Sequence, residues 1–233
     1  MDLGIKGKVA LVAGASKGLG RAVALGLARE GVSLALCARD EEHLSEAATA
    51  IAEETGATVW MRPTDVSRPE ETRLFVREAV SHYGTVHILV NNAGGPPSAT
   101  FFELTDDHWQ QAVQLNLLSA IWLTREAVPH MQKERWGRII NMTSVAVKQP
   151  IEGLMLSNAV RAGVVGFAKT LANELAADNI LVNNVCPGYI LTDRVRELSK
   201  VMAEKRNESP ESIIRTWEEG IPLRRLGKVE EFA

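Results

Sequence analysis

Short apolar runs alternate with stretches of helical periodicity along the whole chain. The apolar runs are rich in Val, Ile, Leu and Ala on both faces of an extended backbone, which is typical of parallel strands that helices cover on both sides. This pattern predicts strands at residues 8–13, 33–38, 57–61, 86–91, 137–142 and 180–186. Apolar positions at helical spacing predict helices near 18–30, 41–55, 69–83, 106–135 and 154–177.

The alternation of strands and helices predicts an α/β fold with one doubly wound parallel sheet of the Rossmann type. Right-handed crossovers would place helices on both faces and give the strand order 3-2-1-4-5-6. No internal repeat or low-complexity segment divides the chain, so we expect one domain over residues 1–233. Two further helices are predicted at about 193–205 and 210–219. We expect residues 189–226, called here the roof segment, to cover a cleft over the strand ends.

Composition and charge narrow the class of partner. With 45% hydrophobic and 24% charged residues, the chain can form one large core. The net charge of −3 comes from interspersed charges of both signs, which argues against a nucleic-acid or anionic-membrane surface. The first apolar run is too short for a signal peptide or a membrane-spanning helix, so we expect a soluble cytoplasmic protein with a small-molecule partner. Cys37 and Cys186 lack the spacing of metal ligands or of a disulfide framework, so we expect buried free thiols and no metal site.

A glycine-rich turn joins the first predicted strand to the first predicted helix. The turn reads Gly14-Ala15-Ser16-Lys17-Gly18-Leu19-Gly20. Glycines let the backbone approach a pyrophosphate, and the helix N-terminus supplies unpaired N–H groups and positive potential. An isolated match of this kind could be a tight turn only, but its position between a strand and a helix favours a dinucleotide site. The residues predicted to contact the cofactor here are Gly14, Ser16, Lys17, Gly18, Leu19 and Gly20.

The charges around this turn predict the type of dinucleotide. Sites for NAD place a carboxylate at the end of the second strand, whereas the 2′-phosphate of NADP needs cations. Here the second strand ends in Arg39 and Asp40, and Lys17 lies in the glycine turn. Lys17 and Arg39 therefore predict NADP(H), with NAD(H) as the alternative. Asp40 weakens this prediction, and Arg39 taken alone could be a solvated surface cation.

Four further motifs follow in order along the chain. They are Thr64-Asp65-Val66, Asn91-Asn92-Ala93-Gly94, Asn116, and Pro187-Gly188-Tyr189-Ile190-Leu191-Thr192. With the Gly-x-x-x-Gly-x-Gly turn, they resemble the short-chain dehydrogenase/reductase family over nearly the whole chain. The resemblance implies adenine contacts from Asp65 and Val66, cofactor contacts from Asn92, Ala93 and Gly94, and nicotinamide contacts from Pro187, Gly188, Ile190 and Thr192. Taken alone, Asp65 could be a turn residue and Asn116 a satisfied helix amide.

The resemblance also bears on assembly and on the end of the chain. Family members commonly form homodimers or homotetramers through the helices that match 106–135 and 154–177, so we expect such an assembly. Residues 228–233 begin an amphipathic pattern that stops within about one helical turn. Family members continue through that helix into a seventh strand. The resemblance therefore implies a seventh strand that is absent or truncated here.

The catalytic segment departs from the family pattern. In the family, a Tyr-x-x-x-Lys pair occupies the positions of Ser157 and Arg161, and the Tyr exchanges a proton with the substrate oxygen. Ser144 and Asn116 match the two other catalytic positions. Arg161 lies on the same helix face as Ser157 and could hold the nicotinamide ribose, but its guanidinium stays charged and does not shuttle a proton. Ser157 is a poor acid, because an aliphatic hydroxyl has a pKa well above the ~10 of Tyr.

Another residue would have to deliver the proton. Tyr189 lies in the Pro-Gly loop and could reach a substrate, although a loop tyrosine usually just packs. Tyr83 ends a surface helix away from the cleft, and Lys148 follows Ser144 as an outside candidate. The five histidines have no catalytic spacing to Ser144, which argues against a Ser-His-Asp hydrolase.

These observations predict an NADP(H)-dependent oxidoreductase that interconverts carbonyls and alcohols with an altered proton donor. The resemblance to 3-oxoacyl-acyl-carrier-protein reductases implies a small-molecule carbonyl or an acyl thioester as substrate. The main alternative is a non-catalytic NADP(H)-binding protein, which the Ser157/Arg161 pair favours. A hydrolase or a structural module is the third hypothesis. Basic and acidic residues alternate in the roof segment, Arg194 among them, and we interpret this mixture as a solvated helix face.

Overall fold

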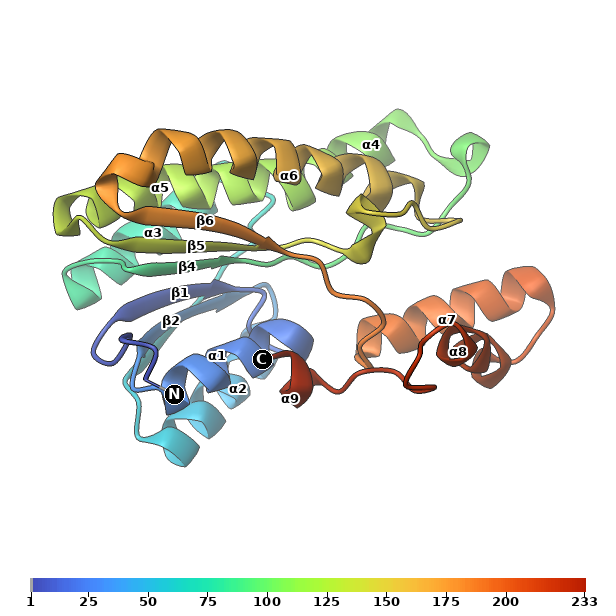
Figure 1. The fold of residues 1–233 in the computed structure, drawn as a ribbon, viewed down its shortest axis with the longest axis horizontal. Helices are drawn as coiled ribbons and strands as arrows, with labels where there is room; N and C mark the ends of the chain where they lie inside the picture. Colours follow the sequence, from blue (N-terminus) through green and yellow to red (C-terminus); the bar gives the residue numbers. More distant parts are fainter. Residues whose placement is uncertain (1) are drawn as a thin grey trace.

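The structure, a computed structural model, describes residues 2–233 and has one sheet of six parallel strands (Figure 1). The strand order is β3-β2-β1-β4-β5-β6, which confirms the predicted topology. The strands are β1 (Val9–Ala13), β2 (Ser33–Ala38), β3 (Val59–Pro63), β4 (Ile88–Asn91), β5 (Gly137–Met142) and β6 (Ile180–Val185).

Helices cover both faces of the sheet and continue beyond its carboxyl edge. They are α1 (Gly18–Arg29), α2 (Glu41–Thr55), α3 (Pro69–Tyr83), α4 (Asp106–Val113), α5 (Ser119–Glu134), α6 (Met155–Leu175), α7 (Asp193–Arg206), α8 (Pro210–Glu219) and α9 (Val229–Phe232). Alternate residues of β1 supply two cores. Leu11 packs on the side of α3, α5 and α6 with Phe75, whereas Val12 packs on the side of α1 and α2 with Leu44.

The long helix predicted at 106–135 is interrupted. Helix α4 ends at Val113, a π-helical turn covers Gln114–Leu118, and α5 follows. A π turn inserts residues without changing the apolar periodicity much, so the sequence pattern did not reveal it. Such turns are frequent at functional sites, and this one contains Asn116.

Two predicted strands also differ in detail. The third was predicted at 57–61 and is found at Val59–Pro63, on the edge of the sheet, where a proline costs no ladder hydrogen bond. The sixth was predicted to be buried on both faces, but Leu181 and Val185 are exposed. Helix α6 covers one face of β6, whereas α1 and α2 lie across the other strands of the sheet (Figure 1).

The two cysteines differ in how deeply they are buried. Cys37 is fully buried, and burial raises the pKa of its thiol to about 12. Cys186 is only partly buried, because it follows the partly exposed strand β6, so its predicted burial was wrong. Its Sγ lies 3.3 Å from the hydroxyl of Thr143. Both thiols are free, and residues 2–233 contain no cluster of possible metal ligands.

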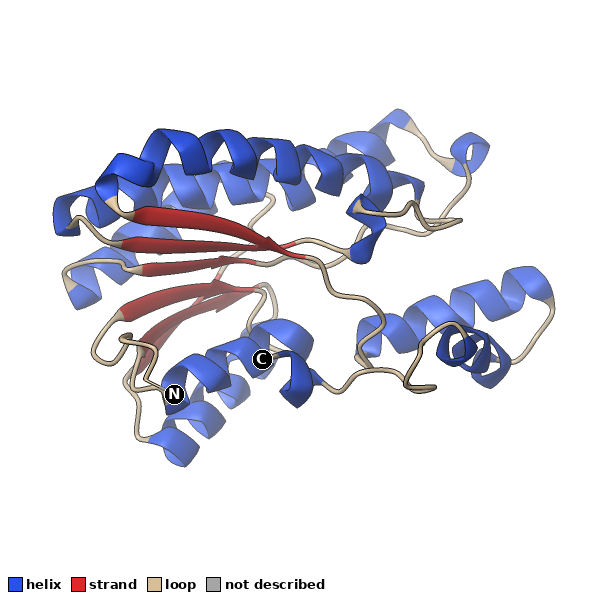
Figure 2. Cartoon of the chain, in the orientation of Figure 1, coloured by secondary structure: helices blue, strands red, loops and turns tan. Residues whose placement is uncertain are grey.

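Most of the predicted roof segment is a pair of helices, α7 and α8, beyond the carboxyl ends of the strands (Figure 2). Thr192 and Ser209 cap the two helices, and Pro210 occupies the first turn of α8, where its missing N–H costs no hydrogen bond. The pair has its own small core, in which Trp217 and Ile213 are buried. Within residues 2–233, no helix is long and apolar enough to span a membrane.

Candidate active site

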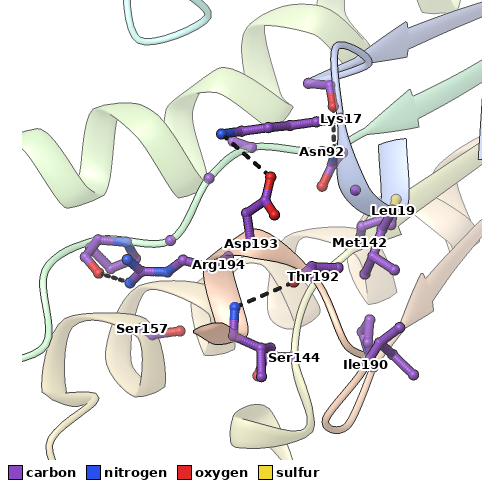
Figure 3. A pocket seen from close by; sticks show the side chains of 18 of the residues that line it. Lys17, Leu19, Asn92, Met142, Ser144, Ser157, Ile190, Thr192, Asp193 and Arg194 are labelled. Atoms are coloured by element: carbon purple, nitrogen blue, oxygen red, sulfur yellow. Dashed lines mark hydrogen bonds and ion pairs between the residues drawn. The ribbon is translucent and has the colours of Figure 1, made fainter. Parts of the chain in front are cut away.

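A cavity of about 510 Å³ opens at the carboxyl ends of the strands, between the sheet and α7 (Figure 3). Most residues predicted to contact cofactor or substrate line it. They are Gly14, Ser16, Lys17, Gly18, Leu19, Arg39, Val66, Asn92, Ala93, Gly94, Ser144, Ser157, Arg161, Pro187, Gly188, Tyr189, Ile190 and Thr192. Gly20, Asp65 and Asn116 do not line this cavity.

The glycine turn is shaped for close approach of a ligand. Gly14 has a φ of +61°, in the left-handed region that favours glycine. A Cβ on Gly20 would lie 2.2 Å from the carbonyl oxygen of Gly14, so Gly20 allows α1 to pack on the turn rather than contacting a ligand itself. The Asn92 amide donates to the carbonyls of Ala13 and Gly14 at 3.1 and 3.2 Å, which ties the end of β4 to the turn. No side chain caps the N-terminus of α1, so its N–H groups are available to a phosphate.

A second group of polar residues lies at the end of β2. Asp40 caps α2, accepting from the His43 backbone N–H at 3.1 Å, and its other oxygen lies 2.7 Å from His43 Nδ1. Hydrogen bonds from His43 hold the pKa of Asp40 below its usual value, and the same side-chain bond raises the pKa of His43. Arg39 and His43 both line the cavity. Among residues 2–233, Arg39 has no ion-pair partner.

Asp65 serves a turn in this structure. Its Oδ1 accepts from the backbone N–H of Ser67 at 3.0 Å and from the Ser67 hydroxyl at 2.7 Å. The neighbouring Val66 lines the cavity, whereas the Asp65 side chain does not. An adenine contact from Asp65 therefore stays a prediction.

Asn116 acts on the loop beside the cavity. Its Nδ2 donates to the carbonyl of Gly94 at 2.7 Å from within the π-helical turn. Its buried Oδ1 has no hydrogen-bond partner in the part of the chain that the structure describes. A small cavity of about 20 Å³ lies there, lined by Asn116 and Arg161 among others, and is large enough for about one water molecule. Asn116 therefore positions the loop and borders a polar pocket behind the main cavity.

Ser144 and Ser157 both line the main cavity (Figure 3). Ser144 follows β5, and its Oγ accepts from the backbone N–H of Ala146 at 3.1 Å. This leaves the Ser144 O–H free to donate to a ligand. Ser157 lies in α6 with a buried side chain, one helical turn before Arg161. The structure thus brings together the three catalytic candidates Ser144, Ser157 and Arg161.

The Arg161 guanidinium is buried against backbone carbonyls. Its Nη1 donates to Met142 at 2.9 Å and to Thr143 at 3.2 Å, and its Nη2 donates to Ala93 at 3.4 Å. Burial lowers the pKa of Arg161 to about 10, with a further contribution from the positive charge of Arg194. Arg161 is therefore cationic at neutral pH, and it has no carboxylate partner among the described residues.

The other proton-donor candidates lie in different places. Tyr189 lines the cavity and stacks on Trp217 with ring centroids 4.7 Å apart, and burial raises its pKa. The Tyr83 hydroxyl donates to the Leu34 carbonyl at 2.8 Å, away from the cavity as predicted. Lys148 does not line the cavity. Among the described residues, His43 is the one histidine that lines it, at the end of β2 rather than beside Ser144.

Arg194 lines the cavity, although the sequence pattern did not predict it as a residue of the site. Its Nη2 donates to the carbonyl of Pro96 at 2.6 Å, and its guanidinium lies over Gly95 at the cavity wall. Arg194 is exposed, as expected for a solvated helix face, but it also lines the cavity because the first turn of α7 faces the strand ends. The signal available was its position two residues after the predicted cofactor residue Thr192. On the same turn, Asp193 Oδ2 lies 3.9 Å from Lys17 Nζ (Figure 3).

Comparison with known proteins identifies the class. The family model described as short chain dehydrogenase matches residues 8–203, so the chain belongs to this family of oxidoreductases. It is 33% identical over 233 residues to the 3-oxoacyl-[acyl-carrier-protein] reductase FabG of Aquifex aeolicus, covering 100% of this chain and 90% of the relative. It is 37% identical over 234 residues to the reductase of the same name from Pseudomonas aeruginosa, covering 99% of this chain and 89% of the relative.

Solved structures show the same fold. L-sorbose reductase from Gluconobacter frateurii, complexed with NADPH and L-sorbose, matches 100% of this chain and 89% of its own, with a TM-score of 0.94 and 36% identity. A variant of the actinorhodin polyketide ketoreductase with NADPH matches 99% of this chain and 88% of its own, with a TM-score of 0.92 and 33% identity. NAD⁺-bound xylitol dehydrogenase has a TM-score of 0.90 and 27% identity, covering 98% of this chain and 90% of its own.

Proposed function

We propose that this protein is an NADP(H)-dependent reductase of small-molecule carbonyl compounds that uses a proton donor other than a Tyr/Lys pair. The observation that carries the proposal is one continuous cavity, which joins the glycine turn at α1 to Ser144 and Ser157 at the strand ends. Similar proteins bound to NADPH support it, as do relatives named as 3-oxoacyl reductases. An acyl thioester is therefore included among the candidate substrates.

The residues present fit a dinucleotide. The absence of a Cβ on Gly14 and Gly20 keeps the turn open, and the uncapped N-terminus of α1 offers N–H donors to a pyrophosphate. Arg39 and His43 would face a 2′-phosphate, and Lys17 offers a third cation at the same cavity. Asp40, which counted against NADP(H), is occupied by His43 and so competes less for this position. When bound, the cofactor would supply or accept the hydride.

The chain's own residues would handle the substrate oxygen. Ser144 would donate a hydrogen bond to the carbonyl oxygen from its free O–H. Arg161 supplies a fixed positive charge nearby, which favours negative charge developing on that oxygen. Tyr189 is our candidate for the donor, because it is the one cavity-lining tyrosine among the described residues and a phenol is a stronger acid than the aliphatic hydroxyl of Ser157. Burial raises the pKa of Tyr189, so it is protonated at neutral pH. We further propose that the α7–α8 pair covers the substrate.

The proposal is tested by fluorescence titration with NADPH, followed by a screen of carbonyl substrates and acyl thioesters at high enzyme concentration. We expect binding of NADPH and slow turnover that falls by an order of magnitude or more in Tyr189→Phe. Turnover that is unchanged in Tyr189→Phe would exclude this donor. Lack of NADPH binding would contradict the proposal as a whole.

The alternative, a non-catalytic NADP(H)-binding protein, has one specific observation in its favour. Arg161 directs its guanidinium to three backbone carbonyls, which suits a role in holding the loops around the cavity. Tight NADPH binding without turnover of any substrate, in the native protein and in a variant with the Tyr/Lys pair restored, would favour this alternative. Homodimer or homotetramer assembly and a cytoplasmic location stay predictions.

A further inference from the structure

Two arginines from different helices donate hydrogen bonds to one loop at the cavity wall. The loop runs from Ala93 to Pro96, and Arg161 donates to its first carbonyl while Arg194 donates to its last. Arg161 comes from α6 and Arg194 from the first turn of α7, and both line the cavity. Their charges are near enough that Arg194 lowers the pKa of Arg161. Together they form what we call the arginine pair.

No carboxylate of the described residues balances the arginine pair. Two carboxylates line the cavity, Asp40 and Asp193. Asp40 is engaged by His43 at the end of β2. Asp193 points toward Lys17, whereas Arg194 points to Pro96 on the other side of the helix turn (Figure 3). The end of the cavity beside Ser144 and Ser157 is therefore positive and uncompensated.

The charge of Arg161 is the unfavourable one, because its guanidinium is buried and a buried cation loses its contact with water. Arg194 stays exposed, but its nearby charge adds repulsion, so a bound anion would offset the charge of both arginines. The glycine turn, the N-terminus of α1 and Lys17 already provide for the pyrophosphate, so the arginine pair is not needed there. Arg194 uses Nη2 for Pro96 and keeps its remaining N–H groups for a ligand.

We infer that the substrate of this site carries a carboxylate close to its carbonyl group, so that it is a 2-oxo or 3-oxo acid or the corresponding hydroxy acid. This inference rests on the proposed function. A guanidinium binds a carboxylate through parallel hydrogen bonds, and the positive site would orient the acid with its carbonyl toward Ser144. Leu154, Val195 and Leu198 also line the cavity and pack in one cluster with Tyr189, so we expect the rest of the substrate to be apolar.

The test measures binding of short 2-oxo and 3-oxo acids with apolar side chains, each paired with its methyl ester, to the NADPH-loaded protein by calorimetry. The ester keeps the carbonyl and the shape but lacks the charge. We expect the best acid to bind on the order of tenfold or more tightly than its ester. Arg194→Gln should reduce this preference to less than about threefold by weakening the acid alone.

Arg196→Gln is the matched control, because Arg196 lies in the same helix, is exposed and does not line the cavity. It should leave the preference for the acid unchanged. Equal binding of acids and esters, binding of neither, or equal weakening of both in Arg194→Gln would overturn the inference while NADPH still binds. Failure of NADPH to bind would contradict the proposed function instead, so the two failures are distinguishable.

Discussion

Arg161 connects several backbone segments around the cavity. The position lies in α6 one turn after Ser157, where the guanidinium reaches three backbone carbonyls and also lines the cavity. The sequence predicted its place and its inability to shuttle a proton, because guanidinium chemistry and helix spacing are both local properties. The sequence did not reveal that Arg194 would lie near it, because that depends on how α7 packs over the strand ends.

Introducing a Tyr/Lys pair at positions 157 and 161 tests whether proton delivery limits turnover. In Ser157→Tyr with Arg161→Lys, an ammonium one turn away would lower the pKa of the new phenol. We expect carbonyl reduction, measured as NADPH oxidation, to rise by up to the order of 10². Ser157→Phe with Arg161→Lys is the control, since it adds similar bulk without the hydroxyl. An equal gain in the control would show that the hydroxyl is not the cause.

Cofactor preference depends on Arg39. In Arg39→Asp the attraction to a 2′-phosphate would be replaced by repulsion, so NADPH should lose affinity relative to NADH, by on the order of tenfold or more. Fluorescence titration with both cofactors measures the ratio. The same charge change at Arg125→Asp, an exposed position of α5 that does not line the cavity and has no ion-pair partner among the described residues, should leave the ratio unchanged. Equal affinities for both cofactors in the native protein would contradict the prediction.

His43 should make this preference depend on pH. The hydrogen bond to Asp40 raises the pKa of His43, so the imidazole is cationic below that raised value and neutral above it. The 2′-phosphate is mostly a dianion above about pH 6. The NADPH-over-NADH preference should therefore decline as the pH rises through the His43 pKa. Titrations over a pH series should show this decline in the native protein and a flatter profile in His43→Gln; identical profiles would exclude His43.

At the scale of elements, the alternation of apolar runs with helical stretches was sufficient to predict the six strands and their order. A parallel strand that is buried on both faces carries apolar residues at nearly every position, which is easy to recognise in a sequence. The errors lie where tertiary context decides. The π turn at Gln114–Leu118 keeps the apolar spacing of a helix, and the exposed face of β6 depends on which helices lie over it. The cavity was predictable from the glycine turn and the strand ends, whereas the turn role of Asp65 was decided by Ser67.

The junction of β1 and α1 tolerates no side chain at Gly20. In Gly20→Ala the new Cβ would collide with the Gly14 carbonyl, so the turn must open. We expect a loss of stability of about 1–3 kcal/mol and a larger loss of NADPH affinity than the stability change alone would produce. Denaturant unfolding and NADPH titration measure the two effects.

Gly166→Ala in α6 is the control for Gly20→Ala. Nothing lies within 4 Å of a Cβ at Gly166, and the helix backbone there suits alanine. It should stabilise the protein by roughly 0.5–1 kcal/mol and leave NADPH binding unchanged. Destabilisation of similar size in both variants would mean that the contact with Gly14 is not the cause.

At the scale of the whole molecule, the fold separates stability from chemistry. The two cores lie on either side of the sheet, whereas the cavity lies at its carboxyl edge beside α7 (Figure 3). Ligands of open α/β sheets bind at this edge, near the switch point where the strand order reverses. Here β1 and β4 flank the switch point, and they supply the glycine turn and the Asn92 loop. Charges introduced at the edge should therefore alter binding more than folding.

The exposed face of β6 should govern association of the polypeptide 1–233. Leu181 and Val185 are exposed on one face of an outer strand, where both apolar surface and unpaired backbone groups favour self-association. We expect the apparent mass in light scattering to rise with concentration, and Leu181→Lys to reduce that rise. Leu74→Lys is the matched control, because Leu74 is similarly exposed but lies on α3. A concentration-independent mass, or equal effects of the two variants, would show that β6 is not the associating surface.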